Sequence, residues 1–220
     1  MANPEYDVPP TFGRYQLLRR IAVGGMGEIH LAKMKGAAGF EKRVVIKKIL
    51  PAYSGDPGFV RRFIEESQLL AELSHANIVP ILDFGEVDGA YYLALDYVDG
   101  ADLRDLLLRL KARGDTFPPA LAAFVGEQIC QGLAYAHERV APDGTPRTII
   151  HRDVSPSNIM LSRDGAVRLL DFGIAKVVGR TVETVTGGIH GKFPYMSPEQ
   201  SRGQPVDPRS DLFAVGAVLY

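Results

Sequence analysis

The stretch His151-Arg152-Asp153-Val154-Ser155-Pro156-Ser157-Asn158 carries the most specific chemistry in this sequence of 220 residues. The triplet Asp171-Phe172-Gly173 follows it further along the chain. Asp153 can accept a proton from an attacking hydroxyl group, and Asn158 and Asp171 offer the hard oxygen ligands that Mg²⁺ prefers. Each residue alone would suit an ordinary turn, but the complete ordered string favours a catalytic site that works with a metal ion.

A glycine-rich segment lies much earlier, between Ile21 and Ile29, and contains Gly24, Gly25 and Gly27. Glycines have no Cβ atom, so their backbone N–H groups can approach phosphate oxygens closely, although many glycine hairpins bind no ligand. No Gly-Lys-Ser/Thr sequence follows, and the next element is strand-like. The segment is therefore not a Walker loop.

Lys47 follows the apolar run Val44-Val45-Ile46 and is expected to lie within a strand. Because a strand alternates its faces, Lys47 shares a face with Val45, while Lys48 points the other way and is expected to be solvated. An inward-facing lysine needs an anion. Glu66, on a following helical segment, is a candidate partner, although a solvated helix face remains the alternative.

The hydrophobic pattern changes character near Asp99-Gly100 and predicts an α+β fold. Before that point, one helical segment, Pro57–Leu73, interrupts strand-like runs, which predicts a small antiparallel sheet with one main helix. These runs are Tyr15–Ile21, Ile29–Met34, Arg43–Leu50, Ile78–Glu86 and Tyr91–Asp96. After it, Asp102–Lys111 and Pro118–Arg139 read as helices. The second has an apolar set consisting of Leu121, Phe124, Val125, Ile129 and Leu133.

The composition is that of an ordinary globular protein, with 25 Lys and Arg against 26 Asp and Glu and a formal net charge of -1. Such a balance gives no reason to expect nucleic-acid binding. Cys130 is the single cysteine, which excludes an intramolecular disulfide within these residues and favours a reducing, cytoplasmic location, although the full-length protein could be anchored in a membrane downstream. The N-terminus lacks the pattern of a signal peptide, and no run of about 18 apolar residues predicts a membrane span.

Taken in order, these motifs resemble those of the eukaryotic-like (Hanks-type) serine/threonine protein kinases found in bacteria. The resemblance runs from about Tyr15 to the last residue. It rests on the glycine segment, Val44 to Lys47, Glu66, the catalytic string and Asp171 to Gly173, together with Ser197-Pro198-Glu199. It implies a bilobal kinase domain over residues 15–220, with an N-lobe of about 15–98 and a partial C-lobe of about 99–220. Residues 1–14 are expected to be a flexible lead-in.

The resemblance also implies a role for each matching residue. Asp153 would be the catalytic base, and Asn158 and Asp171 would hold Mg²⁺. Lys47 would contact the α and β phosphates of ATP and pair with Glu66. His151 and Phe172 would be packing residues, and Asp211 would brace the catalytic loop. The positions expected to contact ATP are Ile21, Ala22, Val23, Gly24, Gly25, Met26, Gly27, Ile29, Val45, Lys47, Glu66, Leu95, Asp96, Val98, Met160 and Asp171. Val23, Ile29, Val45 and Met160 would sandwich the adenine.

Two departures from the family pattern concern charge and are expected to be linked. Ser155 stands where these kinases usually have a lysine that neutralises the γ-phosphate, and loss of that cation should weaken transition-state stabilisation. Lys192 stands where the family usually has threonine. We expect Lys192 to reach the catalytic loop and supply the missing charge, with a solvated lysine as the alternative. Ala22, which replaces the first loop glycine, should be tolerated in ordinary backbone geometry.

The stretch between Gly173 and Ser197 corresponds to the activation segment of these kinases. It contains Thr181, Thr184 and Thr186 as candidate phosphorylation sites, and Arg152 is the residue expected to bind the added phosphate. Thr184 and Thr186 are preferred because they are more central. The expected partners are proteins with Ser or Thr acceptors, including the kinase itself through Thr184 or Thr186.

The last helix has no stop signal before Tyr220, so the C-lobe is expected to be truncated. Ala214, Val215, Val218 and Leu219 are then expected to expose apolar surface.

Other readings remain open at this point. Ser155 and the truncation favour a catalytically silent, kinase-like module that binds nucleotide or a partner, whereas Lys47, Asp153 and the metal ligands argue against it. A small-molecule phosphotransferase of the antibiotic-modifying kind shares a His-x-Asp loop but not the other motifs. Tyrosine specificity is not excluded, although the catalytic loop lacks the alanine and arginine residues typical of tyrosine kinases. The leading expectation is ATP- and Mg²⁺-dependent transfer to Ser or Thr hydroxyl groups.

Overall fold

The structure is a computed structural model that describes residues 10–23, 27–49, 56–141, 143–172 and 192–220. These residues form two compact units. The first contains the described residues up to Leu73 together with Pro80–Tyr97, and the second contains Ser74–Val79 and the described residues from Val98 onward. The main change of unit, between Tyr97 and Val98, falls close to the position at which the hydrophobic pattern changes.

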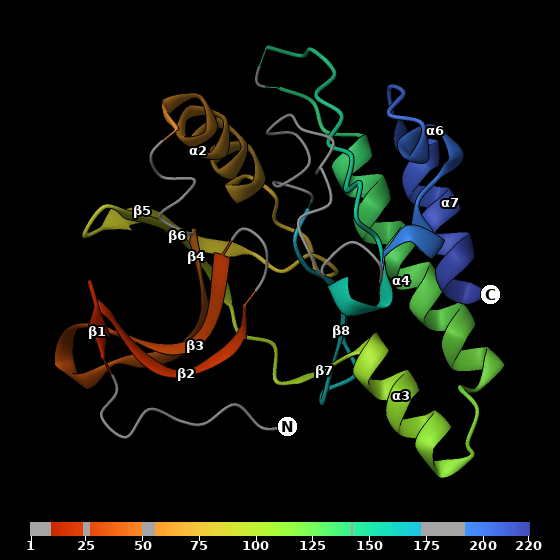
Figure 1. Ribbon diagram of the computed structural model, residues 1–220, viewed down its shortest axis with the longest axis horizontal. Coiled ribbons are helices and arrows are strands. Elements are labelled where there is room, and N and C mark those ends of the chain that lie inside the picture. Colours follow the sequence, from red (N-terminus) through yellow and green to blue (C-terminus); the bar gives the residue numbers. More distant parts are fainter. Residues whose placement is uncertain (1–9, 24–26, 50–55, 142, 173–191) are drawn as a thin grey trace. The chain divides into compact units, whose positions relative to one another are not determined.

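The first unit is built on an antiparallel sheet with the strand order β1-β2-β3-β4-β6-β5. Figure 1 shows that this sheet is strongly curled. A short 3₁₀ turn, η1 (Ala37–Gly39), joins the third and fourth strands. The strands are β1 (Thr11–Phe12), β2 (Tyr15–Val23), β3 (Gly27–Lys35), β4 (Glu41–Ile49), β5 (Ile81–Val87) and β6 (Ala90–Asp96).

Strand β4 alternates between the two faces of the sheet as its sequence predicts. Val44 and Ile46 are completely buried in the hydrophobic core, whereas Val45 and Lys47 point to the opposite face and are partly buried. Lys48 is on the core side, but it is not simply solvated. Its Nζ lies 4.5 Å from the centre of the Phe12 ring, so the ammonium group interacts with an aromatic face.

The expected flexible lead-in ends earlier than predicted, because residues 11 and 12 form a strand. Phe12 is only 7% exposed and packs edge-on against Tyr92. The backbone of Pro10 accepts a hydrogen bond from Leu17, which ties the segment to β2. Burial of one aromatic ring thus converts the end of a proline-containing segment into an edge strand.

A polar cluster joins β2 to β5, two strands that are not neighbours in the sheet. The hydroxyl of Tyr15 donates to Asp83 Oδ2 at 2.5 Å, and that of Tyr92 donates to the same oxygen at 2.9 Å. Arg14 completes the cluster with an ion pair to Asp83 at 2.8 Å. Because the bonds span the sheet order, they hold the sheet in its curled form.

Helix α2 (Pro57–Ala71) begins at Asp56, whose side chain accepts hydrogen bonds from the backbone of Gly58 and Phe59. Its buried face includes Phe59 and Phe63, and the Phe63 ring lies 5.7 Å from that of Phe84 on β5. The next turn places Glu66 in a partly buried position and leaves Glu65 exposed. The helix therefore distinguishes these two glutamates, as its periodicity suggests.

The second unit is mainly helical, as predicted, with one small sheet (Figure 1). Its sheet has the order β7-β8-β9 and is antiparallel. The longest helix buries Val125, Ile129 and Leu133, but Leu121 and Phe124, expected in the same apolar set, are about half exposed. The elements are β7 (Gly100–Asp102), α3 (Leu103–Arg113), α4 (Pro119–His137), η2 (Pro156–Asn158), β8 (Ile159–Ser162), β9 (Val167–Leu169), η3 (Phe193–Tyr195), α6 (Pro198–Ser201) and α7 (Pro208–Leu219).

The strand predicted to start at Ile78 starts at Ile81 instead. Ile78 and Val79 belong to the second unit, where Ile78 forms a bridge with Leu169 and Val79 donates its N–H to the Leu169 carbonyl. Asn77 fixes this segment by donating from Nδ2 to Gln128 Oε1 at 3.0 Å and to the Val167 carbonyl at 2.9 Å. A buried asparagine therefore redirects an apolar run that sequence pattern alone assigns to the first sheet.

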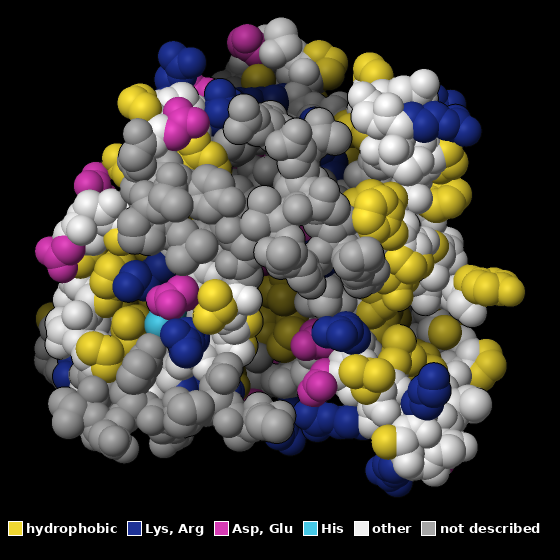
Figure 2. Space-filling model, in the orientation of Figure 1, with side chains coloured by type: hydrophobic (Ala, Val, Ile, Leu, Met, Phe, Trp, Pro, Cys, Tyr) yellow, Lys and Arg dark blue, Asp and Glu magenta, His cyan; other side chains and the backbone are white. Residues whose placement is uncertain are grey.

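Helix α7 packs along α4 in the second unit (Figure 1), and its burial differs from the expectation. Ala214 and Val215 are only 4% and 5% exposed, because they lie on the packed face of the helix. Leu219 is 46% exposed, as anticipated. Figure 2 shows apolar side chains gathered over these helices. Within the described residues, no helix combines the length and the apolar character needed to cross a bilayer.

Gly27, the first residue of β3, provides a test of the register between β3 and β4. A Cβ atom at this position would lie 2.1 Å from the Lys48 carbonyl oxygen, a distance that backbone atoms can relieve only by moving apart. We expect Gly27→Ala to lower the free energy of unfolding by about 1–3 kcal/mol, measured by urea denaturation without nucleotide. Gly216→Ala, which meets no atom within 4 Å, is the control and should not destabilise. Equal stability of the two variants would contradict the register.

Candidate active site

The carboxylate of Asp211, a residue of α7 that is 1% exposed, binds the backbone at the start of the segment 151–158, the catalytic loop. Its Oδ1 accepts a hydrogen bond from the backbone N–H of Arg152 at 2.8 Å. Its Oδ2 accepts from the backbone N–H of His151 at 2.8 Å and lies 2.8 Å from His137 Nε2. A buried carboxylate with several donors is well compensated for its desolvation, so the loop has one rigid anchor.

The ring of His151 is completely buried and serves as a packing residue. Its Nδ1 accepts the backbone N–H of Asp153 at 3.2 Å, which leaves Nε2 to carry the proton and donate to the Leu170 carbonyl at 2.9 Å. Burial lowers the pKa of His151 below its ordinary value, although the nearby carboxylates oppose that effect. The Phe172 ring lies 4.5 Å away, so the neutral imidazole connects the catalytic string to the Asp171-Phe172 segment.

Asp153 and Asn158 lie side by side in the loop. Asn158 Nδ2 donates to both the backbone carbonyl and the Oδ2 atom of Asp153, each at 2.8 Å. These bonds fix the direction of the carboxylate from within the loop. They also leave the other amide atom of Asn158, the oxygen Oδ1, as the one that could serve a metal ion.

Two residues of this region adopt left-handed backbone conformations that side chains rarely take. The φ angle is +63° at Arg152 and +46° at Asp171. Such angles carry a modest energetic cost and are found at functional sites whose surroundings enforce them. Here the enforcing contacts are those of Asp211 on one side and the hydrogen bond from Leu170 N–H to the Asn158 carbonyl, at 2.9 Å, on the other.

That last hydrogen bond brings Asn158 next to the residue preceding Asp171, so an amide oxygen and a carboxylate belong to adjoining backbone positions. Oxygen donors of this kind fit Mg²⁺, which usually takes one or two carboxylates and completes its shell with phosphate and water. Within the described part of the chain, no cluster of three or more His, Cys, Asp or Glu side chains is arranged to hold a metal. Asn158 Oδ1 and the carboxylate of Asp171 are nevertheless oxygen donors of the type that such an ion accepts.

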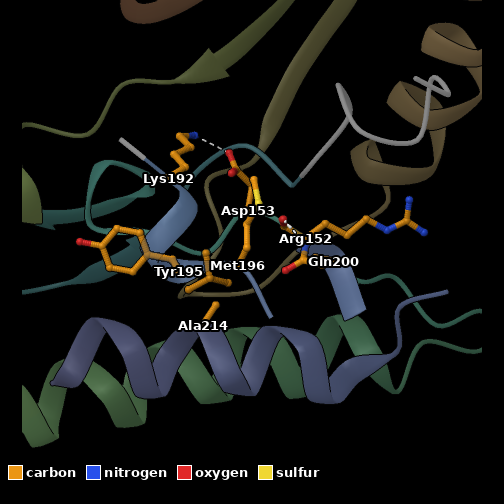
Figure 3. Close-up of a pocket in the computed structure, with 8 residues that line it drawn as sticks. Arg152, Asp153, Lys192, Tyr195, Met196, Gln200 and Ala214 are labelled. Atoms are coloured by element: carbon orange, nitrogen blue, oxygen red, sulfur yellow. Dashed lines mark hydrogen bonds and ion pairs between the residues drawn. The ribbon is translucent and has the colours of Figure 1, made fainter. Parts of the chain in front are cut away.

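Lys192 reaches the catalytic loop, as its position in the sequence led us to expect. Its Nζ contacts Asp153 Oδ2 in a partly buried ion pair (Figure 3). Both residues line a small pocket together with Arg152, Val154, Tyr195, Met196, Gln200 and Ala214. Ser155, where the family usually has lysine, is 2% exposed, and its Oγ lies 3.2 Å from Ser157 Oγ. The cation at Asp153 is thus supplied from outside the loop.

The segment that carries Lys192 is itself tied to the catalytic loop. Ser197 and Gln200 form a capping box at the start of α6, in which each side chain accepts a backbone hydrogen bond from the other residue. Gln200 Nε2 then donates to the Arg152 carbonyl at 2.8 Å. Glu199 accepts a hydrogen bond from Ser210 Oγ, which joins α6 to α7.

In the first unit, four of the expected nucleotide-binding residues lie on the face of the sheet opposite the core, namely Ile29, Val45, Lys47 and Leu95. The register pairs Ile29 with Lys47 and Val45 with Leu95, and directly paired residues share a face. A lysine surrounded by aliphatic side chains therefore emerges from this face. Such a surface can accept an apolar ring and an anionic group at the same time.

The first strands differ from the expectation at Val23. The register pairs Ala22 with Ile29 and Val23 with Glu28, so Ala22 rather than Val23 shares the face of Ile29. Val23 is 60% exposed. Ile21 falls at the register shift between Arg20 and Ala22, a local bulge that changes the alternation of faces.

The remaining candidates occupy varied positions. Asp96 forms an ion pair with Lys42 at 2.9 Å, and Val98, the first residue after the change of unit, is buried. Met160 lies on β8, paired with Arg168, on the face opposite the buried Ile159. Several predicted sites lie outside the described residues, and these are Gly24, Gly25, Met26, Thr181, Thr184 and Thr186.

Sequence reasoning missed three contributors to the site, namely His137, Gln200 and Ser210. His137 sits at the end of α4 and meets Asp211, and Ser210 meets Glu199. His137 and Asp211 are 74 residues apart, and Ser210 and Glu199, although 11 residues apart, belong to different helices, so no spacing within one helix could reveal these pairs. Gln200 carried one signal, because Ser197-Pro198-Glu199-Gln200 matches the Ser-x-x-Gln pattern of a capping box.

Removing the charge of Asp211 tests whether it anchors the loop. Asp211→Asn keeps the shape but presents an NH₂ group to one of the existing donors, which leaves buried polar groups unsatisfied. We expect a loss of about 2–3 kcal/mol in the free energy of unfolding, measured in urea. Asp115→Asn removes an exposed ion pair with Arg113 and should change stability by less than about 1 kcal/mol. A similar small effect for Asp211→Asn would contradict the anchoring role.

The buried His151 ring predicts a pH dependence of stability. Since its pKa in the folded protein is lowered from the ordinary value of 6.5, the unfolded chain binds a proton first when the solution is acidified. Stability should therefore fall as the pH drops below that value, and His30, whose burial also lowers its pKa, adds to the effect. Urea unfolding between about pH 8 and pH 5 measures the slope. NMR of the His151 ring identifies its share, and titration at or above 6.5 would refute the assignment.

Comparison with known proteins adds an independent finding. The family model described as the protein kinase domain matches residues 15–220. Tyrosine-protein kinase MasK of Myxococcus xanthus is 46% identical over 100% of this chain, which covers 36% of that protein. Serine/threonine-protein kinase PrkC of Bacillus subtilis is 38% identical over 94% of the chain, which covers 30% of that protein. The chain thus spans about a third of the length of these curated relatives.

Solved structures agree with this result. The crystal structure of the Mycobacterium tuberculosis PknI kinase domain matches 97% of this chain, with 30% identity and a TM-score of 0.71, and 75% of that domain is covered. The bacterial kinases among the relatives confirm the resemblance drawn from the motifs. By family model, relatives and fold, this chain belongs to the protein kinase family.

Proposed function

We propose that the protein containing this chain transfers the γ-phosphoryl group of ATP to Ser or Thr hydroxyl groups of protein substrates. The observation that carries the proposal is the carboxylate of Asp153, aimed by Asn158 and paired with Lys192 in a loop anchored on Asp211. A carboxylate fixed in this way is suited to receive a proton from an acceptor hydroxyl. A turn that served only to connect two strands would need none of these contacts.

In the proposed reaction, the acceptor oxygen forms a bond to the γ-phosphorus while the bond from that phosphorus to the bridging oxygen breaks. The hydroxyl proton passes to Asp153, and ADP is the leaving group. Asn158 keeps the carboxylate in position during the transfer, and the nearby positive charge of Lys192 offsets charge on the phosphoryl group. Positioning and electrostatic stabilisation would supply most of the rate enhancement.

Each unit contributes residues suited to the nucleotide and its metal. The first offers Lys47 beside Ile29 and Val45, for the α and β phosphates and the adenine. The second offers Asn158 and Asp171 to hold Mg²⁺, which when bound neutralises phosphate charge and orients the β and γ phosphates. Glu66 is the proposed partner of Lys47, and its partly buried place on α2 is compatible with this role.

The choice between serine or threonine and tyrosine as acceptor forms part of the proposal. PrkC is named a serine/threonine kinase, and the catalytic loop resembles that class. MasK, at 46% identity, is named a tyrosine kinase, so tyrosine is the second candidate acceptor. We further propose autophosphorylation at Thr184 or Thr186 and a cytoplasmic location, in keeping with a single cysteine, Cys130, and no possible internal disulfide.

The alternative of a catalytically silent module receives no support from the sequence, which retains Lys47, Asp153, Asn158 and Asp171. Nor does the absence of lysine at Ser155 favour it, because Lys192 brings a cation to the same carboxylate.

Transfer from radiolabelled ATP with Mg²⁺, measured with the full gene product, tests this function. Asp153→Asn should lower the rate by at least about 100-fold, because the proton acceptor is lost. Asp164→Asn, in the exposed turn between β8 and β9, is the matched control and should keep the wild-type rate. Phosphoamino-acid analysis of the products should give phosphoserine or phosphothreonine. Phosphotyrosine alone would overturn the acceptor assignment, and label transfer that survives Asp153→Asn would overturn the mechanism.

A further inference from the structure

We propose that Lys192 is a catalytic residue that contacts the transferring γ-phosphoryl group, in the place of the cation that the catalytic loop itself lacks. The proposal rests on the phosphoryl-transfer function above. It assigns a specific role to a lysine at the start of the segment that also carries η3 and α6.

Between His151 and Asn158, the described side chains include two that could be cationic, His151 and Arg152. The His151 ring is buried, with one nitrogen accepting a hydrogen bond, and is therefore neutral. The Arg152 side chain extends away from Asp153, as Figure 3 shows. Ser155 contributes a hydroxyl next to that of Ser157 and no charge.

Lys192 Nζ contacts Asp153 Oδ2, the oxygen that also accepts from Asn158 Nδ2. Since Asp153 is the proposed proton acceptor, the acceptor hydroxyl lies next to this carboxylate. The phosphoryl group must therefore come close to the carboxylate during transfer. An ammonium group already held there lies within reach of the phosphoryl oxygens. Its three donors allow it to keep Asp153 while it binds a phosphate oxygen.

The Lys192 carbonyl accepts the N–H of Tyr195 at 3.1 Å, which closes the turn η3. Gln200 then fastens the same segment to the Arg152 carbonyl at 2.8 Å. Lys192 is thus presented by a short segment bonded to the catalytic loop at its far end, and its position is more defined than that of a lysine on a free surface loop.

The surroundings of Asp153 separate this role from a structural one. The Lys192 side chain is 34% exposed, and the Asp153 carboxylate, although only 16% exposed, keeps the hydrogen bond from Asn158 when the lysine is removed, so loss of the pair should affect folding only modestly. A structural salt bridge therefore predicts a small effect of its loss on every property. Loss of a charge that stabilises the transition state predicts a large effect on turnover and almost none on stability.

The experiment measures kcat and KM for ATP in the full gene product and its variants. Lys192→Ala should lower kcat about 100-fold, with an unchanged thermal unfolding midpoint. Lys192→Arg should keep a substantial part of the activity, because the charge remains. Adding Ser155→Lys to Lys192→Ala should restore kcat by about tenfold or more, since it returns a cation to the family position. The control is Lys33→Ala, which removes a lysine of similar exposure, paired with Glu41, and should leave kcat unchanged.

A binding measurement keeps the inference separate from the proposed activity. Calorimetry compares ADP with a non-hydrolysable ATP analogue in wild type and Lys192→Ala. The variant should lose much of the preference for the triphosphate, because the contact is with the γ-phosphate. Absence of phosphoryl transfer in wild type, with this shift in preference retained, would overturn the function but not the contact. Wild-type kcat in Lys192→Ala, or an unchanged preference, would overturn the role of Lys192.

Discussion

One buried carboxylate, that of Asp211, determines the shape of the catalytic loop. Its two oxygens receive the consecutive backbone N–H groups of His151 and Arg152, and these bonds oblige Arg152 to adopt a left-handed conformation. The following residue, Asp153, then emerges in a defined direction and meets Asn158 and Lys192. Without the anchor, neither the unusual backbone angle nor the direction of the reacting carboxylate would have a physical cause.

Much of the fold follows from alternation and turn residues in the sequence. The faces of β4 are clear from Val44 to Lys47, because inward positions are apolar and a strand has a period of two. Local pattern fails where a distant contact decides the outcome. Phe12 forms a strand because it packs on Tyr92, and Ile78 leaves the expected strand because it pairs with Leu169 instead. Neither partner lies within the windows that a periodicity argument considers.

The site shows the same division. Asp153, Asn158 and Asp171 could be assigned because their types and order carry the chemistry, and the reach of Lys192 could be anticipated from a charge missing at Ser155. The supports could not, since His137 and Asp211 lie on separate helices and meet only after the second unit has folded. The face of Val23 could not be predicted either, because a bulge near Ile21 shifts the register and pairs Ala22, not Val23, with Ile29. Sequence thus reveals reacting groups more readily than the contacts that orient them.

The cluster of Tyr15, Tyr92 and Asp83 has a consequence for association between molecules. An open sheet has two outer strands, and their unpaired backbone groups can recruit strands from other chains. Here hydrogen bonds connect β2, next to one outer strand, with β5, the other outer strand, and so draw the two margins of the sheet together. Short β1 adds little free backbone of its own. A substitution at Asp83 would therefore loosen the curl of the sheet and leave its two outer strands more open to intermolecular strand pairing.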